Sequence, residues 1–122
     1  MVAVILIVED DTFTREMLEM TLKDEGYQTL SAGDVGEALV LLESARDIDV
    51  LVTDIYLKTA ILGGCDLARK AIEIRPTLRV LYTTGNFVTA EMEALFLEGT
   101  ALLRKPYTGR QLQHSLETLL AA

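Results

Sequence analysis

Three acidic residues of the sequence lie at the ends of strongly apolar runs. Glu9 and Asp10 follow the run at 2–8, and Asp54 ends the run at 50–54. Carboxylates crowded together repel one another unless a cation lies between them. Magnesium suits such a set, because it takes hard oxygen ligands, binds few carboxylates directly and keeps part of its water shell. If the fold brings these residues together, they predict a magnesium site.

Two further polar side chains follow later apolar runs. Thr84 comes after Arg79–Thr83, and Lys105 comes after Ala101–Leu103. A lysine can neutralise an incoming phosphoryl group, and a threonine hydroxyl can donate a hydrogen bond to it. Taken singly, the acidic residues would be helix caps or turn residues, and the lysine would be solvated. Their common position after strands favours one site that handles a phosphoryl group.

Strands are predicted where β-branched and leucine residues form short continuous runs. Val2–Val8 has the pattern of a strand that is buried on both faces of a parallel sheet. Val50–Thr53 and Arg79–Thr83 have the same pattern. Tyr27–Ser31 and Ala101–Leu103 are weaker candidates. The sheet is therefore expected to have helices on both faces.

Helices are predicted between the strands from apolar spacing and from capping residues. Asp34 with Glu37, and Thr108 with Gln111, match the pattern in which two side chains bond each other's backbone N–H groups. Gly26 stands where a left-handed residue ends the first helix. The expected helices are Thr14–Glu25, Val35–Ala45, Asp66–Ile74, Thr89–Glu98 and Gly109–Leu120. The residues expected to face inward are Met17, Leu18, Thr21 and Leu22 in the first helix and Leu112, Leu116, Leu119 and Leu120 in the last.

The repeated order of strand and helix predicts an α/β fold, a parallel sheet between two layers of helices. In such sheets, ligands bind beyond the carboxyl ends of the strands, where the chain winding reverses. This is the edge at which Glu9, Asp10, Asp54, Thr84 and Lys105 are expected.

Composition and charge exclude several classes of protein. With 122 residues, of which 50% are hydrophobic, the chain is expected to form one domain, 1–122. The formal net charge of −8 repels phosphate backbones, so we expect no nucleic-acid partner. The single cysteine, Cys65, cannot form an internal disulfide. With neither a signal-peptide pattern nor a membrane-length apolar run, we expect a cytoplasmic protein without a membrane partner.

Four motifs carry a resemblance to a known family. They are Val-Glu-Asp at 8–10, DVLVTD at 49–54, VLYTTG at 80–85 and Lys-Pro-Tyr at 105–107. With them, the chain closely resembles the receiver domain of two-component response regulators over its whole length. The resemblance implies a doubly wound, flavodoxin-like (βα)5 fold with strand order 2-1-3-4-5.

The resemblance also implies a role for each site residue. Glu9 and Asp10 match the magnesium-binding acidic pair of the family, and Asp54 matches its phosphorylated aspartate and third carboxylate ligand. Tyr56 is expected to contribute its backbone carbonyl to the metal, and its ring to screen the acyl phosphate from water.

Two further residues match the family's phosphoryl-sensing positions. Thr84 matches the hydroxyl that responds to phosphorylation. Lys105 matches the lysine that contacts the phosphoryl group, and its bond to Pro106 is expected to be cis.

The function implied is that of a phosphoacceptor in two-component signalling. A histidine kinase or a histidine phosphotransfer protein would phosphorylate Asp54, and the altered conformation would act on a downstream protein target. Catalysis would be limited to the domain's own phosphoryl transfer and autodephosphorylation. We expect a monomer or weak homodimer with no output domain in this chain. The pieces LYTTG and LLRKPY look most like receivers in or beside hybrid sensor kinases.

Two departures from the family pattern support an alternative. Lys58 stands where the family usually has proline, and the loop from there to Gly63 is longer than usual. Leu102 stands at the family's aromatic switch position. The alternative is a receiver-like adaptor that acts through phosphorylation-independent protein contacts. A cofactor binder or hydrolase is disfavoured, because the acidic turn after the first strand repels anions.

Other residues are assigned to surfaces or to the core. Phe13 and Met20 lie outside the buried face of the first helix and could meet a partner. At least one residue of Leu95–Leu97 should be exposed, since three consecutive helical residues cannot face one side. His114 is expected on the surface, and Cys65 is expected to be a packed small residue.

Overall fold

The computed structural model describes residues 2–44, 46–57, 63–85, 88–97 and 99–121 and has one parallel sheet in the order β2-β1-β3-β4-β5. The strands are β1 Val4–Val8, β2 Gln28–Ala32, β3 Val50–Asp54, β4 Arg79–Thr84 and β5 Ala101–Arg104. The helices are α1 Thr12–Asp24, α2 Val35–Leu42, α3 Gly63–Ile74, α4 Ala90–Glu93 and α5 Gly109–Ala121. The α/β fold and the strand order are therefore confirmed.

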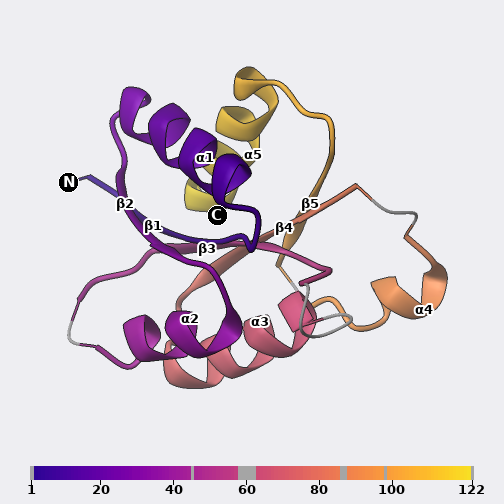
Figure 1. Ribbon diagram of the computed structural model, residues 1–122. Helices are drawn as coiled ribbons and strands as arrows, with labels where there is room; N and C mark the ends of the chain where they lie inside the picture. The colour runs from indigo at the N-terminus through magenta and orange to yellow at the C-terminus, as the bar shows by residue number, and fades with distance from the viewer. Residues whose placement is uncertain (1, 45, 58–62, 86–87, 98, 122) are drawn as a thin grey trace.

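Alternation along the strands divides the core into two layers, one on each side of the sheet. Ile5 and Ile7 of β1 pack with α1 and α5, whereas Leu6 and Val8 pack with α2 and α3. Figure 1 shows α1 and α5 over one face of the sheet and α2 and α3 over the other. Among the described residues, no helix is long and apolar enough to cross a membrane.

Capping residues define where several helices begin and end. Asp11 accepts a hydrogen bond from the backbone N–H of Thr14, so α1 begins two residues earlier than expected. Gly26 follows the C-terminus of α1 with a φ of 94°, a left-handed conformation that glycine adopts without strain. Thr108 and Gln111 exchange hydrogen bonds at the start of α5, which confirms the predicted cap.

Helix α4 is much shorter than the predicted helix Thr89–Glu98. Thr89 caps it as expected, but only Ala90–Glu93 is α-helical. The amides of Leu95 and Phe96 bond to carbonyls three residues back, which is the tighter pattern of a 3₁₀ turn. The ring of Phe96 stacks on Tyr82 of β4, with centroids 4.6 Å apart and planes at 22°. This contact with the sheet competes with continuation of the helix.

Other helix boundaries and buried faces also differ in part from the prediction. Helix α2 ends at Leu42 rather than at 45, and α3 begins at Gly63 rather than at Asp66. Met17 is 47% exposed and Leu120 is 37% exposed, although both were expected to face inward. Each lies one position from a buried neighbour, Leu18 or Leu119, so helical geometry turns it toward solvent. Leu95 is exposed, as predicted.

Candidate functional site

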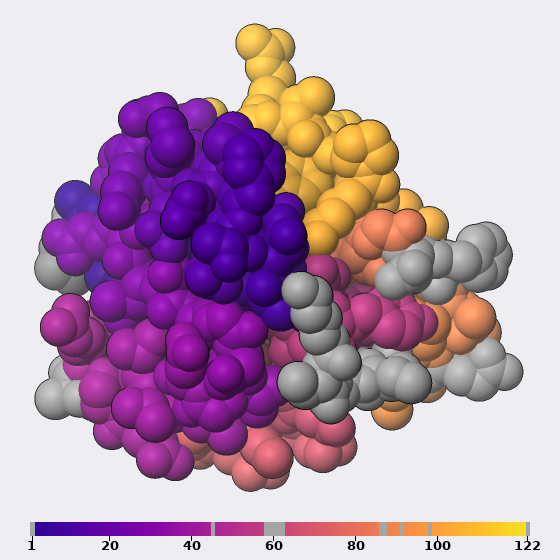
Figure 2. Space-filling view, viewed as in Figure 1, coloured from indigo at the N-terminus to yellow at the C-terminus, as the bar shows by residue number. Residues whose placement is uncertain are grey.

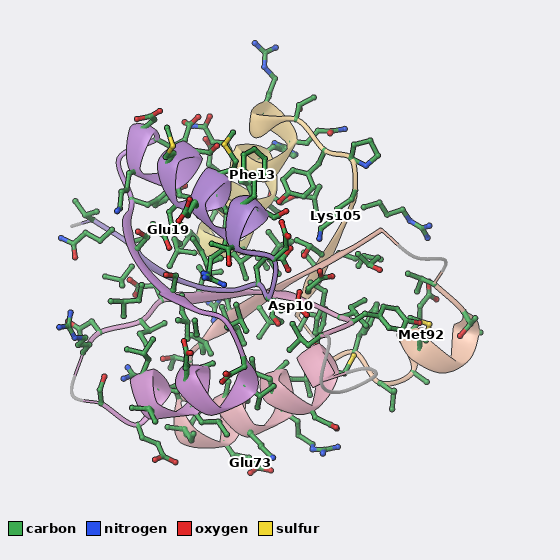
Figure 3. The ribbon with its side chains drawn as sticks, in the orientation of Figure 1. Asp10, Phe13, Glu19, Glu73, Met92 and Lys105 are labelled. Atoms are coloured by element: carbon green, nitrogen blue, oxygen red, sulfur yellow. The ribbon has the colours of Figure 1, made fainter. Side chains whose placement is uncertain are left out.

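Parallel pairing brings the ends of four strands to one edge of the sheet, which we call the carboxyl edge. Val8 pairs with Thr53, Asp54 pairs with Thr83, and Thr84 pairs with Arg104. The residues that follow β1 and β5 are thereby placed beside Asp54. Figure 3 shows Asp10 and Lys105, two of the predicted site residues, at this edge.

Lys105 joins two of the three predicted carboxylates. Its Nζ lies 2.9 Å from Oδ2 of Asp54 and 3.4 Å from Oε1 of Glu9. Burial lowers the pKa of Lys105, but the hydrogen bond and charge of Asp54, together with the charge of Glu9, outweigh it and raise the pKa above its usual value. The ammonium group therefore stays charged and holds a positive charge at the carboxyl edge.

Glu9 is a buried carboxyl with one unsatisfied oxygen. Glu9 is 4% exposed, and its Oε2 accepts no hydrogen bond among the described residues. Burial raises the pKa of Glu9 to about 7; Lys105 opposes the rise and Asp54 adds to it. An unpartnered carboxylate oxygen beside a second carboxylate is an environment in which a cation is favourable.

The predicted metal ligands do not form a ready-made metal cluster. Within the described part of the chain, no group of three acidic, histidine or cysteine side chains is arranged to hold a metal ion. Instead, Lys105 contacts both Glu9 and Asp54. The donor types nevertheless fit a hard cation, because they are carboxylate oxygens and one of them, Oε2 of Glu9, is unpartnered.

Thr84 lies within β4 rather than after it. It is the last residue of the strand and is almost fully buried. Its carbonyl accepts a 2.8 Å hydrogen bond from the backbone N–H of Lys105. Leu102 pairs with Tyr82 in the register of β4 and β5. An aliphatic side chain therefore occupies the family's aromatic switch position.

The Lys105–Pro106 peptide bond is cis, as the resemblance implied. Lys58 and the loop that follows it lie outside the described residues, as do Asn86 and Phe87 after β4. His114 is exposed and Cys65 is buried, both as predicted. Burial raises the pKa of the Cys65 thiol.

Two contacts at the carboxyl edge were not anticipated from the sequence. Nη1 of Arg15 donates a 2.8 Å hydrogen bond to the carbonyl of Glu9. The backbone N–H of Gly64 donates to the carbonyl of Ile55, and a methyl group at Gly64 would overlap the carbonyl oxygen of Asp54. An arginine on the first helix and the glycine pair that begins α3 were the only sequence signals.

An apolar surface lies on the outside of α1, next to the carboxyl edge. Phe13 is 71% exposed and Met20 is 60% exposed, as predicted. A groove of about 190 Å³ runs between α1 and α5, and its lining includes Met17, Thr21 and Tyr107. The surfaces of α1 and α5 meet on the face shown in Figure 2.

The sheet order and the charged carboxyl edge define a doubly wound α/β protein with its site at the switch point of the sheet. The family model of the response regulator receiver domain matches residues 5–117. The chain therefore belongs to the response regulator receiver domain family. Receiver domains are signalling domains that generally bind Mg²⁺ for phosphorylation.

Known proteins of this family match nearly the whole chain. The response regulator receiver protein CpdR of Brucella abortus is 30% identical over 119 residues, which cover 97% of each chain. A crystal structure of a response regulator receiver protein from Sinorhizobium medicae is 30% identical, with a TM-score of 0.89 over 99% of this chain and 96% of the other. Sensor histidine kinase RcsC of Escherichia coli is 30% identical over 105 residues, 85% of this chain but 11% of the kinase.

Proposed function

We propose that this chain, as one receiver domain over 1–122, accepts a phosphoryl group on Asp54 from a histidine kinase or a histidine phosphotransfer protein. The observation that carries the proposal is the contact of Lys105 Nζ with both Asp54 and the buried Glu9. A lysine held there supplies the positive charge that an arriving phosphoryl group needs. The family membership supplies the donor class.

In the proposed reaction, a carboxylate oxygen of Asp54 attacks the phosphorus of a phosphohistidine. The new P–O bond forms as the P–N bond breaks, and the donor's imidazole, which carries a proton on its other ring nitrogen, leaves as a neutral ring with the electron pair of that bond. Lys105 already donates to Oδ2 of Asp54, so its ammonium group is close enough to stabilise charge on the phosphoryl oxygens.

The carboxylates of Glu9, Asp10 and Asp54 and the backbone carbonyl of Tyr56 would hold Mg²⁺ in this proposal. When bound, the cation supplies electrostatic stabilisation of the phosphoryl group. The unpartnered Oε2 of Glu9 supports the assignment. Lys105 contacts the other oxygen of Glu9, Oε1, so in this proposal Lys105 orients the carboxylate that binds the cation.

The proposed output is a change in protein contacts. Thr84 would respond to phosphorylation through its hydroxyl, and its carbonyl is already bonded to the backbone of Lys105. The segment at 85–88 would then change the position of α4 and alter binding of a downstream protein. Leu102 has neither a ring nor a hydroxyl with which to follow Thr84, so the switch would work without an aromatic rotamer at that position.

Leu102 also favours a second candidate, a receiver-like adaptor that binds partners without phosphorylation. One experiment separates the two. The protein is incubated with Mg²⁺ and a small phosphodonor such as phosphoramidate, and intact mass is recorded. Asp54→Asn is compared with Asp47→Asn, an exposed aspartate that precedes β3 and so lies at the opposite end of that strand from Asp54.

We expect one phosphoryl increment on the wild type and on Asp47→Asn, and none on Asp54→Asn. Labelling of Asp54→Asn at full stoichiometry would place the acceptor elsewhere. A folded wild-type protein that is labelled neither by the small donor nor by a histidine kinase would support the adaptor.

A further inference from the structure

Both main-chain polar groups of Glu9 are held by neighbouring elements. Its N–H donates a 3.2 Å hydrogen bond to the carbonyl of Ala32, the last residue of β2. Its carbonyl accepts a 2.8 Å hydrogen bond from Nη1 of Arg15 on α1, and the bond is partly buried. The peptide before Glu9 is therefore held by β2, and the peptide that joins Glu9 to Asp10 is held through its carbonyl by Arg15.

The guanidinium group of Arg15 rests against Gly33, the residue after β2. A methyl group added at Gly33 would lie 3.1 Å from Nη1 of Arg15 and 3.7 Å from its Cζ. The first distance is tighter than most contacts of a Cβ atom, so the guanidinium would have to shift by a few tenths of an ångström. Gly33 does not have the left-handed backbone of Gly26, so the need for space, and not backbone strain, explains glycine here.

Arg15 acts on the backbone of Glu9 and not on its carboxylate. The ion-pair partner of Glu9 is Lys105, and among the described residues Arg15 makes no ion pair. An arginine that donates to a carbonyl fixes the plane of the peptide that follows. That plane sets the directions from which the side chains of Glu9 and Asp10 leave the main chain.

We propose that Arg15, seated against Gly33, is the positioning residue that orients the Glu9–Asp10 pair for a divalent cation. The inference rests on the proposed function, because it takes from it that Glu9 and Asp10 bind the cation. Without Arg15, the Glu9 carbonyl loses its partner and the peptide can rotate. The cation then binds only after the pair is reordered, so its affinity falls.

The test uses Mg²⁺ alone as the probe, titrated into the full chain and followed by the amide resonance of Asp10. The variants are Arg15→Met, Arg15→Lys and the control Lys23→Met, which makes the same charge change at an exposed position of the same helix. We expect Arg15→Met to weaken Mg²⁺ binding about tenfold, as is typical when an outer partner of a metal ligand is removed. Arg15→Lys should recover part of the affinity, and Lys23→Met should stay within about twofold of wild type.

Gly33→Ala provides an independent variant that leaves Arg15 in place. We expect it to weaken Mg²⁺ binding by displacing the guanidinium, and to have no further effect in the Arg15→Met background. The phosphorylation rate of Arg15→Met should fall at low Mg²⁺ and return to the wild-type rate at saturating Mg²⁺. Thermal unfolding without metal reports the fold of each variant separately.

The outcomes distinguish the inference from the proposed function. A wild-type protein that binds no Mg²⁺ would overturn both. Wild-type binding with unchanged affinity in Arg15→Met would overturn only the role of Arg15. Equal losses of Mg²⁺ affinity in Arg15→Met and Lys23→Met would show an effect of net charge. Additive losses of affinity from Gly33→Ala and Arg15→Met would show that Gly33 does not act through Arg15. Either result contradicts the inference.

Discussion

The hydroxyl of Tyr56 donates a hydrogen bond to Sδ of Met92, 3.3 Å away. Tyr56 lies two residues after Asp54, and Met92 is a buried residue of α4 (Figure 3). The contact joins the segment that follows the proposed phosphoacceptor to the helix expected to move. It provides a link between them that does not pass through Leu102.

Tyr56→Phe should loosen α4 without affecting metal binding. The variant removes one hydrogen bond to sulfur but keeps the ring and the backbone carbonyl, so we expect a cost of about 0.5–1 kcal/mol in unfolding free energy. Hydrogen exchange at the amides of Met92 and Glu93 should become faster, while Mg²⁺ affinity stays the same. Tyr27→Phe, on the other side of the sheet, serves as the control. Unchanged exchange in α4 would show that the hydrogen bond does not hold the helix.

Tyr82→Phe should stabilise the protein. Tyr82 is fully buried, and its hydroxyl has no hydrogen bond of good geometry among the described residues. The backbone of Leu97 lowers the pKa of this hydroxyl, but burial outweighs it and raises the pKa, so the fold carries the cost of a poorly satisfied polar group. Removing that hydroxyl while keeping the ring on Phe96 should raise the unfolding free energy by about 1 kcal/mol. Chemical denaturation measures the change. A loss of stability would mean that the hydroxyl has a bonding partner.

The metal-free protein should lose stability as pH rises from about 4.5 to about 7, because the pKa of Glu9 rises from 4.5 when exposed to about 7 in the fold. Between these values the folded state binds more protons than the unfolded state, so the unfolding free energy falls with increasing pH. The stabilising contribution of Glu9 is complete below pH 4.5 and is lost above a pH of about 7. The full difference is on the order of 3 kcal/mol.

Denaturation in the presence of a chelator, repeated across this pH range, measures the slope. Glu9→Gln should remove most of it, because its side chain does not titrate. Added Mg²⁺ should stabilise the wild type most at the alkaline end, where Glu9 is ionised. A slope of the same size in Glu9→Gln would assign the effect to another group.

Phe13→Ala combined with Met20→Ala should slow phosphotransfer from a histidine kinase. The two exposed side chains are seven positions apart on one side of α1, the helix that begins at the carboxyl edge that a phosphohistidine must approach. Loss of a buried interface anchor costs 2 kcal/mol or more, so we expect transfer to slow by roughly thirtyfold. Labelling by a small phosphodonor should be nearly unchanged. Val40→Ala, an equally exposed apolar residue on α2, is the matched control.

The result that counts against a docking role is equal slowing of both reactions in the double variant. In that case Phe13 and Met20 would support the fold or the site rather than bind the kinase.

Local sequence patterns were sufficient to predict the order of elements. Val4–Val8 is apolar throughout because it is buried on both faces, and Asp34 and Thr108 mark helix starts through short-range hydrogen bonds. The end of α4 could not be predicted in this way. It depends on the stacking of Phe96 on Tyr82, a contact between separate segments that no local pattern contains.

The same distinction applies to the candidate site. Positions at the ends of strands predicted which residues meet at the carboxyl edge, because parallel pairing brings strand ends together. The contact of Lys105 with both Glu9 and Asp54 depends on side-chain conformations that follow from packing. The hydrogen bond from Arg15 was missed for the same reason, since an arginine on an amphipathic helix usually reaches solvent.

Gly64 and Gly85 differ in the replacements that they allow. Any side chain at Gly64 would overlap the carbonyl of Asp54, whereas a methyl group at Gly85 would meet only the side chain of Lys105, at 3.9 Å. In a library containing every substitution, position 64 should return glycine alone among active clones, and position 85 should return alanine as well. Position 64 is thus fixed as glycine by the close approach of the Asp54 carbonyl, and variation that changes signalling specificity is expected at other positions.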